Sequence, residues 1–160
     1  MVLAFWRFIV LLLAALSLTM ESAHVLELPQ KIEYSPQLYA AVNGSMYRYF
    51  AIVGGFYQIV SIVLAVVLAY LVRKRRPSFR WTLAGAVLLA AAFGIWMAAV
   101  QPVNLEIGRT VPAAIPNAWM NLRYRWEYGH AAGFLVQLLG FSALLVSVLV
   151  ETPQRVISGD

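Results

Sequence analysis

Both histidines of this chain lie near a glutamate at helical spacing. Glu27 follows His24 by three residues, and Glu127 precedes His130 by three residues. Residues three or four apart share one face of an α-helix, and an imidazole beside a carboxylate is a typical general base. The same four side chains could instead supply nitrogen and oxygen ligands to a metal ion. The spacing therefore predicts either proton transfer or metal binding.

Further polar and aromatic residues accompany these pairs. Arg123 shares a helical face with Glu127 and His130, and Asn104 follows the preceding apolar run. Because arginine and asparagine donors can stabilise an oxyanion, we group them with the two histidines and two glutamates as candidate catalytic residues. The candidates for substrate binding are Trp126, Trp119, Tyr39, Asn43, Arg125 and Gln101.

Four apolar runs must position these side chains. The chain has 160 residues, of which 62% are hydrophobic and 12% are charged, and this composition excludes an ordinary soluble domain. The expected spans are 2–27, 46–72, 81–101 and 118–150, each long enough to cross a membrane as a helix. We expect an all-α integral membrane protein, with residues 1–160 forming one antiparallel four-helix bundle and short helical or irregular outer connections.

A compact basic segment predicts the orientation. Residues 73–80 contain Arg73-Lys74-Arg75-Arg76 and Arg80 and no acidic residue. The positive-inside rule places this loop in the cytoplasm, so both termini also face inward. The formal net charge of +5 is concentrated beside hydrophobic runs, which favours a membrane surface over nucleic acid. We expect a multi-pass protein of the plasma membrane.

The expected topology brings the ionisable residues to one end of the bundle. Pro29 disfavours helix at the residue before it, so we expect the first helix to end near Glu27. The first helix then runs outward and the fourth runs inward, which places His24 and His130 at the same outer depth. We expect Glu127 to orient His130. Ionisable groups near a membrane are costly and usually functional, so this end is the predicted site.

Simpler explanations exist for each of these residues. Glu27 could pair with Lys31, and Arg123 with Glu127, as ordinary ion pairs one helical turn apart. Trp126 and its aromatic neighbours could form an interfacial belt. These explanations account less well for two His/Glu pairs at matched depth.

Short motifs resemble those of a known family. Residues 121–130, Asn-Leu-Arg-Tyr-Arg-Trp-Glu-Tyr-Gly-His, resemble the Arg-Trp-Glu-x-x-His signature of the anthrone oxygenase-like membrane proteins, and residues 102–104 and 24–31 agree with it. The resemblance implies a four-helix membrane protein, in some members an oxygenase that converts an anthrone to an anthraquinone with molecular oxygen and no added cofactor. Many bacterial members are uncharacterised. The matching positions are His24, Glu27, Asn104, Arg125, Trp126, Glu127 and His130.

Three functions follow as alternatives. The first is a small membrane oxidoreductase or oxygenase that acts on a hydrophobic aromatic or quinone-like molecule, with His130 as the base. The second is a metal or haem protein that uses His24, Glu27, Glu127 and His130, with the two histidines as axial ligands in the case of haem. The third is a non-enzymatic membrane subunit or small-molecule-binding protein. The expected partners are the lipid bilayer and a hydrophobic small molecule, with a homo-oligomer left open.

Overall fold

The structure, a computed structural model, describes residues 1–107 and 119–152, and all regular secondary structure within these ranges is helical. The elements are α1 (Val2–Lys31), α2 (Pro36–Met46), α3 (Arg48–Leu71), α4 (Arg76–Ile95), the π-helical turn η1 (Trp96–Val100), α5 (Gln101–Ile107) and α6 (Trp119–Leu149). Four helical segments are long and apolar enough to cross a membrane: Val2–Lys31, Tyr49–Leu71, Arg76–Glu106 and Trp119–Leu149. For the residues that the structure describes, the prediction of helical structure with four candidate spans is confirmed.

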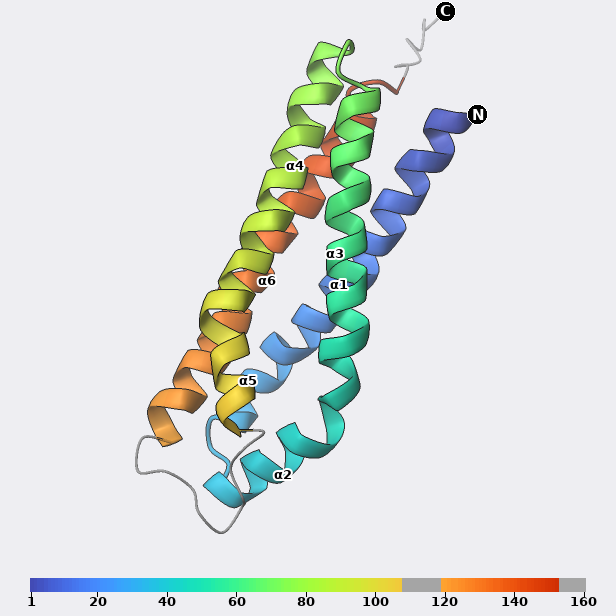
Figure 1. Ribbon diagram of the computed structural model, residues 1–160. Coiled ribbons are helices and arrows are strands. Elements are labelled where there is room, and N and C mark those ends of the chain that lie inside the picture. Colours follow the sequence, from blue (N-terminus) through green and yellow to red (C-terminus); the bar gives the residue numbers. More distant parts are fainter. Residues whose placement is uncertain (108–118, 153–160) are drawn as a thin grey trace, which may run out of the picture.

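The four long segments form a bundle in which α6 packs against α1 and α4, and α3 packs against the same two helices. The start of α1, the α3–α4 turn and the end of α6 lie at one end, which we call the basic end (Figure 1). The end of α1, α2, α5 and the start of α6 lie at the other end, which we call the site end (Figure 1).

Large apolar side chains cover the outside of this bundle. Phe5 and Phe8 on α1, Phe56 on α3 and Leu135 and Leu139 on α6 are all exposed. Soluble proteins rarely expose apolar surface on this scale, whereas lipid tails are a suitable environment for it. The surface composition agrees with the membrane interpretation of the sequence.

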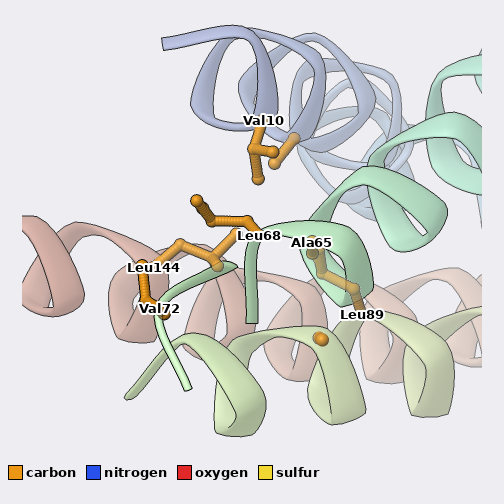
Figure 2. Packing of buried hydrophobic residues seen from close by; sticks show 8 residues of the cluster. Val10, Ala65, Leu68, Val72, Leu89 and Leu144 are labelled. Atoms are coloured by element: carbon orange, nitrogen blue, oxygen red, sulfur yellow. The ribbon is translucent and has the colours of Figure 1, made fainter. Parts of the chain in front are cut away.

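The apolar core lies toward the basic end. Figure 2 shows buried side chains of all four long helices meeting there, among them Val10, Leu68, Leu89 and Leu144. Helices α4 and α6 approach closely because Gly85 lies at their contact, where an added Cβ would lie 2.7 Å from Cγ of Leu144. Small residues at helix contacts are typical of membrane bundles.

A charged cluster closes the basic end. Arg7 lies 2.6 Å from the Glu151 carboxylate and 3.1 Å from the Ser78 hydroxyl, while Arg75 lies 3.1 Å from the same carboxylate. Burial acts to raise the pKa of Glu151, but the hydrogen bonds and charges of Arg7 and Arg75 outweigh it and lower that pKa. The cluster joins α1 and the α3–α4 turn to the end of α6.

The first helix extends past its predicted end. We expected it to stop near Glu27, but α1 continues through Pro29 to Lys31. Proline removes the hydrogen bond that its own N–H would donate and crowds the carbonyl four residues earlier, but the ladder continues beyond it, with the Ile32 N–H bonded to the Leu28 carbonyl at 3.1 Å. The additional turn carries Lys31 into the interior, where it is 1% exposed.

The third span also extends beyond its predicted boundary at residue 101. The helix widens into η1 and continues as α5 to Ile107. Pro102 cannot donate to the Ala98 carbonyl, and Nη2 of Arg125 donates to that carbonyl instead, at 2.6 Å. A π-helical turn beside proline relieves the crowding that would otherwise end the helix.

The third span, predicted to begin at residue 81, begins at Arg76, so Arg76 and Arg80 of the predicted basic loop lie on α4. The other boundaries differ little from those expected. The second span, predicted as 46–72, is α3 with bounds Arg48–Leu71. The fourth, predicted as 118–150, is α6 with bounds Trp119–Leu149, and residue 118 lies outside the described residues.

Candidate functional site

The two histidines meet inside the site end. His24 on α1 and His130 on α6 have ring centroids 4.2 Å apart and are 4% and 5% exposed. Their approach depends on the direct packing of α1 against α6. The predicted proximity of the two rings is confirmed, whereas their catalytic role stays a prediction.

The carboxylate that contacts His130 is Glu21, and the expectation that Glu127 orients this ring is wrong. Nδ1 of His130 lies 2.8 Å from Oε2 of Glu21, across the α1–α6 contact. Glu127 lies almost one turn nearer the start of α6 and reaches other partners. When Nδ1–H donates to a carboxylate, Nε2 carries the lone pair and is the basic nitrogen. Glu21 is three residues before His24 on α1, so the same spacing rule could have selected it.

Glu127 belongs to a buried ionic cluster. Its side chain is fully buried, and its Oε1 lies 3.0 Å from Nζ of Lys31 and accepts a hydrogen bond from the Tyr39 hydroxyl at 2.8 Å. The Lys31 ammonium also lies 4.1 Å from the ring centroid of Trp126 and 4.5 Å from that of Tyr47. Ion pairing and cation–π contacts together join α1, α2 and α6.

The simple ion pairs expected from spacing are therefore replaced by contacts between helices. Lys31 pairs with Glu127, and Glu27 accepts a hydrogen bond from the Tyr47 hydroxyl. Arg123 is 2% exposed and donates to the Ile32 carbonyl at 2.8 Å, with its guanidinium 4.7 Å from the Tyr39 ring centroid. These contacts hold the chain after α1 against α6.

Both tyrosines of this network remain hydroxyl donors. Burial, followed by the charge and hydrogen bond of Glu127, raises the pKa of Tyr39 far above its ordinary value. Burial and the hydrogen bond to Glu27 likewise raise the pKa of Tyr47. Neither phenol is a suitable proton acceptor near neutral pH.

A cavity of about 350 Å³ opens beside the two histidines, between α1, α3, α4 and α6. Half of the predicted site residues line it: His24, His130, Asn43, Gln101, Asn104 and Trp126. The other half are outside its lining: Glu27, Glu127, Arg123, Arg125, Trp119 and Tyr39. The sequence therefore predicted the end of the bundle that holds the cavity, but only half of the residues chosen there line it.

Contacts among the predicted residues fix several of their side chains. Oδ1 of Asn104 accepts a hydrogen bond from the Trp126 indole N–H at 2.7 Å, which fixes the ring beside His24. Trp119 packs edge-on against Tyr39, with ring centroids 5.5 Å apart. Arg125 donates a hydrogen bond to the Ala98 carbonyl, as described above.

The cavity extends from the histidines toward the middle of the bundle, where sequence analysis assigned no site residue. Ser17, Gln58 and Gln137 line this deeper part. The Ser17 hydroxyl donates to Oε1 of Gln58 at 2.5 Å, and Nε2 of Gln58 donates to the Leu89 carbonyl at 2.9 Å. Polar side chains within apolar spans were the signal that could have indicated this region.

Glycines keep the walls of the cavity open. A Cβ added at Gly133 would lie 3.8 Å from Oε2 of Glu21, and one added at Gly55 would have no described atom within 4 Å. Gly129 differs, because its Cβ would lie 2.9 Å from Cγ2 of Val100. Gly129 therefore permits helix contact, whereas Gly133 and Gly55 leave space.

The metal hypothesis does not match this geometry. Within residues 1–107 and 119–152, no group of three or more His, Asp or Glu side chains is arranged to hold a metal ion. The proposed ligands Glu27 and Glu127 are bonded to Tyr47 and to Lys31 with Tyr39. Axial haem ligands approach iron from opposite faces of the macrocycle, and rings 4.2 Å apart leave no room for it.

Comparisons with protein-family models, with curated proteins and with solved structures found no match to this chain. The resemblance to the anthrone oxygenase-like proteins thus rests on the sequence motifs alone.

Proposed function

We propose that this protein is a small membrane oxidoreductase of the oxygenase type that binds a hydrophobic aromatic or quinone-like molecule. The observation that carries the proposal is a cavity of about 350 Å³ whose wall includes His130 bonded to Glu21. This volume is within the range of small-molecule sites, about 300–1,000 Å³. The surface of the cavity is mostly apolar and includes the aromatic rings of Phe50, Phe93 and Trp96, which suits a flat apolar ligand.

His130 is the proposed base. Nε2 removes a proton from an activated C–H group of the substrate, and the Glu21 carboxylate stabilises the imidazolium that forms. The resulting carbanion combines with molecular oxygen to form a C–O bond and a hydroperoxide. Loss of the second C–H proton then breaks the O–O bond and releases water, so CH₂ and O₂ become C=O and H₂O.

Asn104 is the proposed donor to the peroxide anion that forms at the reacting carbon of the substrate. Its Oδ1 is engaged by Trp126, which leaves the amide NH₂ for a ligand in the cavity that Asn104 lines. The sequence suggested the same role for Arg123, but Arg123 donates a hydrogen bond to the Ile32 carbonyl and lies outside the cavity lining. Its proposed role is to support the site end.

We also propose an antiparallel arrangement in the plasma membrane with both termini in the cytoplasm. The basic residues 73–80 support this orientation through the positive-inside rule. The site end then lies near the outer surface. A lipid-soluble substrate reaches the cavity from the bilayer.

The proposal is tested with purified protein in lipid nanodiscs and anthrone as the probe, by measuring oxygen uptake and quinone absorbance. We expect His130→Gln to lower turnover by about 10²–10⁴-fold, the usual contribution of a general base. Glu21→Gln should also lower turnover, and Glu33→Gln is the matched control because Glu33 is exposed and outside the cavity lining. Helical circular dichroism checks that each variant is folded.

Two results would overturn parts of this proposal. Turnover at the wild-type rate in folded His130→Gln would show that His130 is not the base. Binding of anthrone without oxygen uptake by the wild-type protein would favour the alternative of a non-enzymatic small-molecule-binding protein.

A further inference from the structure

Gln137 occupies the end of the cavity remote from the histidines. It follows His130 by seven residues on α6, which places it about 10 Å farther along the helix axis and within about 20° of the same face. Gln137 lines the cavity and is 1% exposed. The cavity wall therefore carries a polar side chain at each end of this 10 Å interval.

The Gln137 amide lacks a partner that its burial would normally require. Its Nε2 is buried and has no hydrogen-bond partner among the described residues. Gln58 lines the same region, but its amide nitrogen and oxygen are both bonded, to the Leu89 carbonyl and the Ser17 hydroxyl. An unsatisfied buried donor is costly, so an unpaired amide on a residue of the cavity wall calls for an acceptor from a ligand.

Gly133 lies between His130 and Gln137 and leaves this part of the wall without a side chain. Gly133 lines the cavity, and a Cβ there would meet open space up to Oε2 of Glu21 at 3.8 Å. A planar molecule can thus lie along α6 and contact both polar side chains. Subtracting about 3 Å for the contact at each end from the interval of about 10 Å leaves about 4 Å. This length is comparable to the distance, in one six-membered ring, from the reacting carbon to an oxygen on the opposite carbon.

We propose that Gln137 determines specificity by donating a hydrogen bond to a carbonyl oxygen of the ligand at the deep end of the cavity. The carbon on the opposite side of the same ring then faces His24 and His130. The ligand class is a flat aromatic ketone with its carbonyl toward the middle of the bundle. This inference rests on the proposed function of the cavity, and adds the residue and the orientation that select the ligand.

The test compares two probes that differ at one position, anthrone and 9,10-dihydroanthracene, in which CH₂ replaces the carbonyl. Binding to the protein in nanodiscs is measured without oxygen, by quenching of tryptophan fluorescence. Each probe also partitions into lipid, to the same extent with every variant. We therefore compare the ratio of the affinities for anthrone and for 9,10-dihydroanthracene in each variant with the same ratio in the wild-type protein. The variants are Gln137→Leu, Gln137→Met as a second apolar replacement, and Thr82→Val as the control at a buried polar residue outside the cavity lining.

We expect the preference for anthrone to fall about tenfold in both Gln137 variants, the effect of losing one buried hydrogen bond. Their thermal stability should be kept or raised, because a buried unpaired amide is removed. Thr82→Val should retain the preference, since Thr82 is outside the cavity lining and its hydroxyl bonds to the Ser78 carbonyl. A purely structural role for Gln137 would not change the ratio.

The failures are distinguishable. An unchanged ratio in folded Gln137→Leu and Gln137→Met overturns the inference and leaves the cavity as a ligand site. Failure of the wild-type protein to bind either probe overturns both the inference and the proposed function.

Discussion

The lining glycines allow the cavity to be filled without disturbing the bundle. In Gly133→Leu, the added Cβ lies 3.8 Å from its nearest described neighbour, Oε2 of Glu21. The fold should tolerate the change, and replacing glycine within a helix should contribute up to about 1 kcal/mol of stability. The rest of the side chain then extends into the cavity of about 350 Å³ that the ligand requires.

The matched control is Gly85→Ala in the core of the basic end. Its Cβ would lie 2.7 Å from Cγ of Leu144 and 3.0 Å from the Gly140 carbonyl oxygen. Leu144 is 1% exposed and has little space to move, so overpacking should cost about 1–3 kcal/mol, partly offset by the gain in helix propensity. The smaller substitution is thus expected to be the more damaging to stability.

Two measurements separate these effects. Gly133→Leu should weaken anthrone binding at least about tenfold, or about 1.4 kcal/mol, at an unchanged or higher thermal midpoint. Gly85→Ala should lower the midpoint and leave the binding of the folded protein unchanged. Gly55→Leu provides a second obstruction from α3, where no described atom lies within 4 Å of the added Cβ. Wild-type affinity in folded Gly133→Leu and Gly55→Leu would refute the assignment of this cavity as the ligand site.

Three further predictions concern stability, each measured as a change in thermal midpoint or in unfolding free energy. Glu127→Gln should destabilise the protein by about 3 kcal/mol because it leaves the Lys31 ammonium buried without its carboxylate; the double variant Lys31→Met/Glu127→Gln should recover part of the loss, and additive losses would contradict this explanation. Asn104→Leu should cost about 1–2 kcal/mol because the Trp126 indole loses its acceptor, whereas Gln101→Leu, the control in the same lining, should cost less. The pKa of Glu151 is lowered in the folded protein. The stability that its ionised carboxylate contributes is therefore present above the unfolded pKa of about 4.3 and is lost as pH falls through the lowered pKa. Glu151→Gln should remove this acid-dependent loss of stability, and an identical loss in the variant would show that other groups cause it.

The four candidate spans could be predicted because length and apolar composition determine them almost alone. The same topology also predicted that His24 and His130 meet, since the end of the first span and the start of the last belong to the same end of the bundle. The order of spans places both residues at this end, whereas their centroid separation of 4.2 Å also depends on the rotation of each helix about its axis.

The helix boundaries at prolines could not be predicted from local rules. Pro29 and Pro102 each remove one backbone donor, but the helix continues past both. At Pro102 the freed Ala98 carbonyl is satisfied by Arg125 from α6. That partner is remote in sequence, so no local pattern reveals it.

The hydrogen-bond and ion-pair partners of the site residues could not be predicted from the sequence either. Spacing identifies neighbours on one helix, and it suggested Glu127 for His130 and Glu27 for Lys31. The structure instead pairs His130 with Glu21 and Lys31 with Glu127, each across two helices. Such pairs depend on the rotation of each helix about its axis, which is set by packing of the whole bundle.

The most direct measurement of the central claim is an experimental structure of the protein in nanodiscs, determined without oxygen in the presence of anthrone. The account predicts ligand density inside the cavity between α1, α3, α4 and α6, with the carbonyl at Gln137 and the opposite carbon at His130. Anthrone bound only at the lipid-facing surface, with the cavity empty, would contradict it.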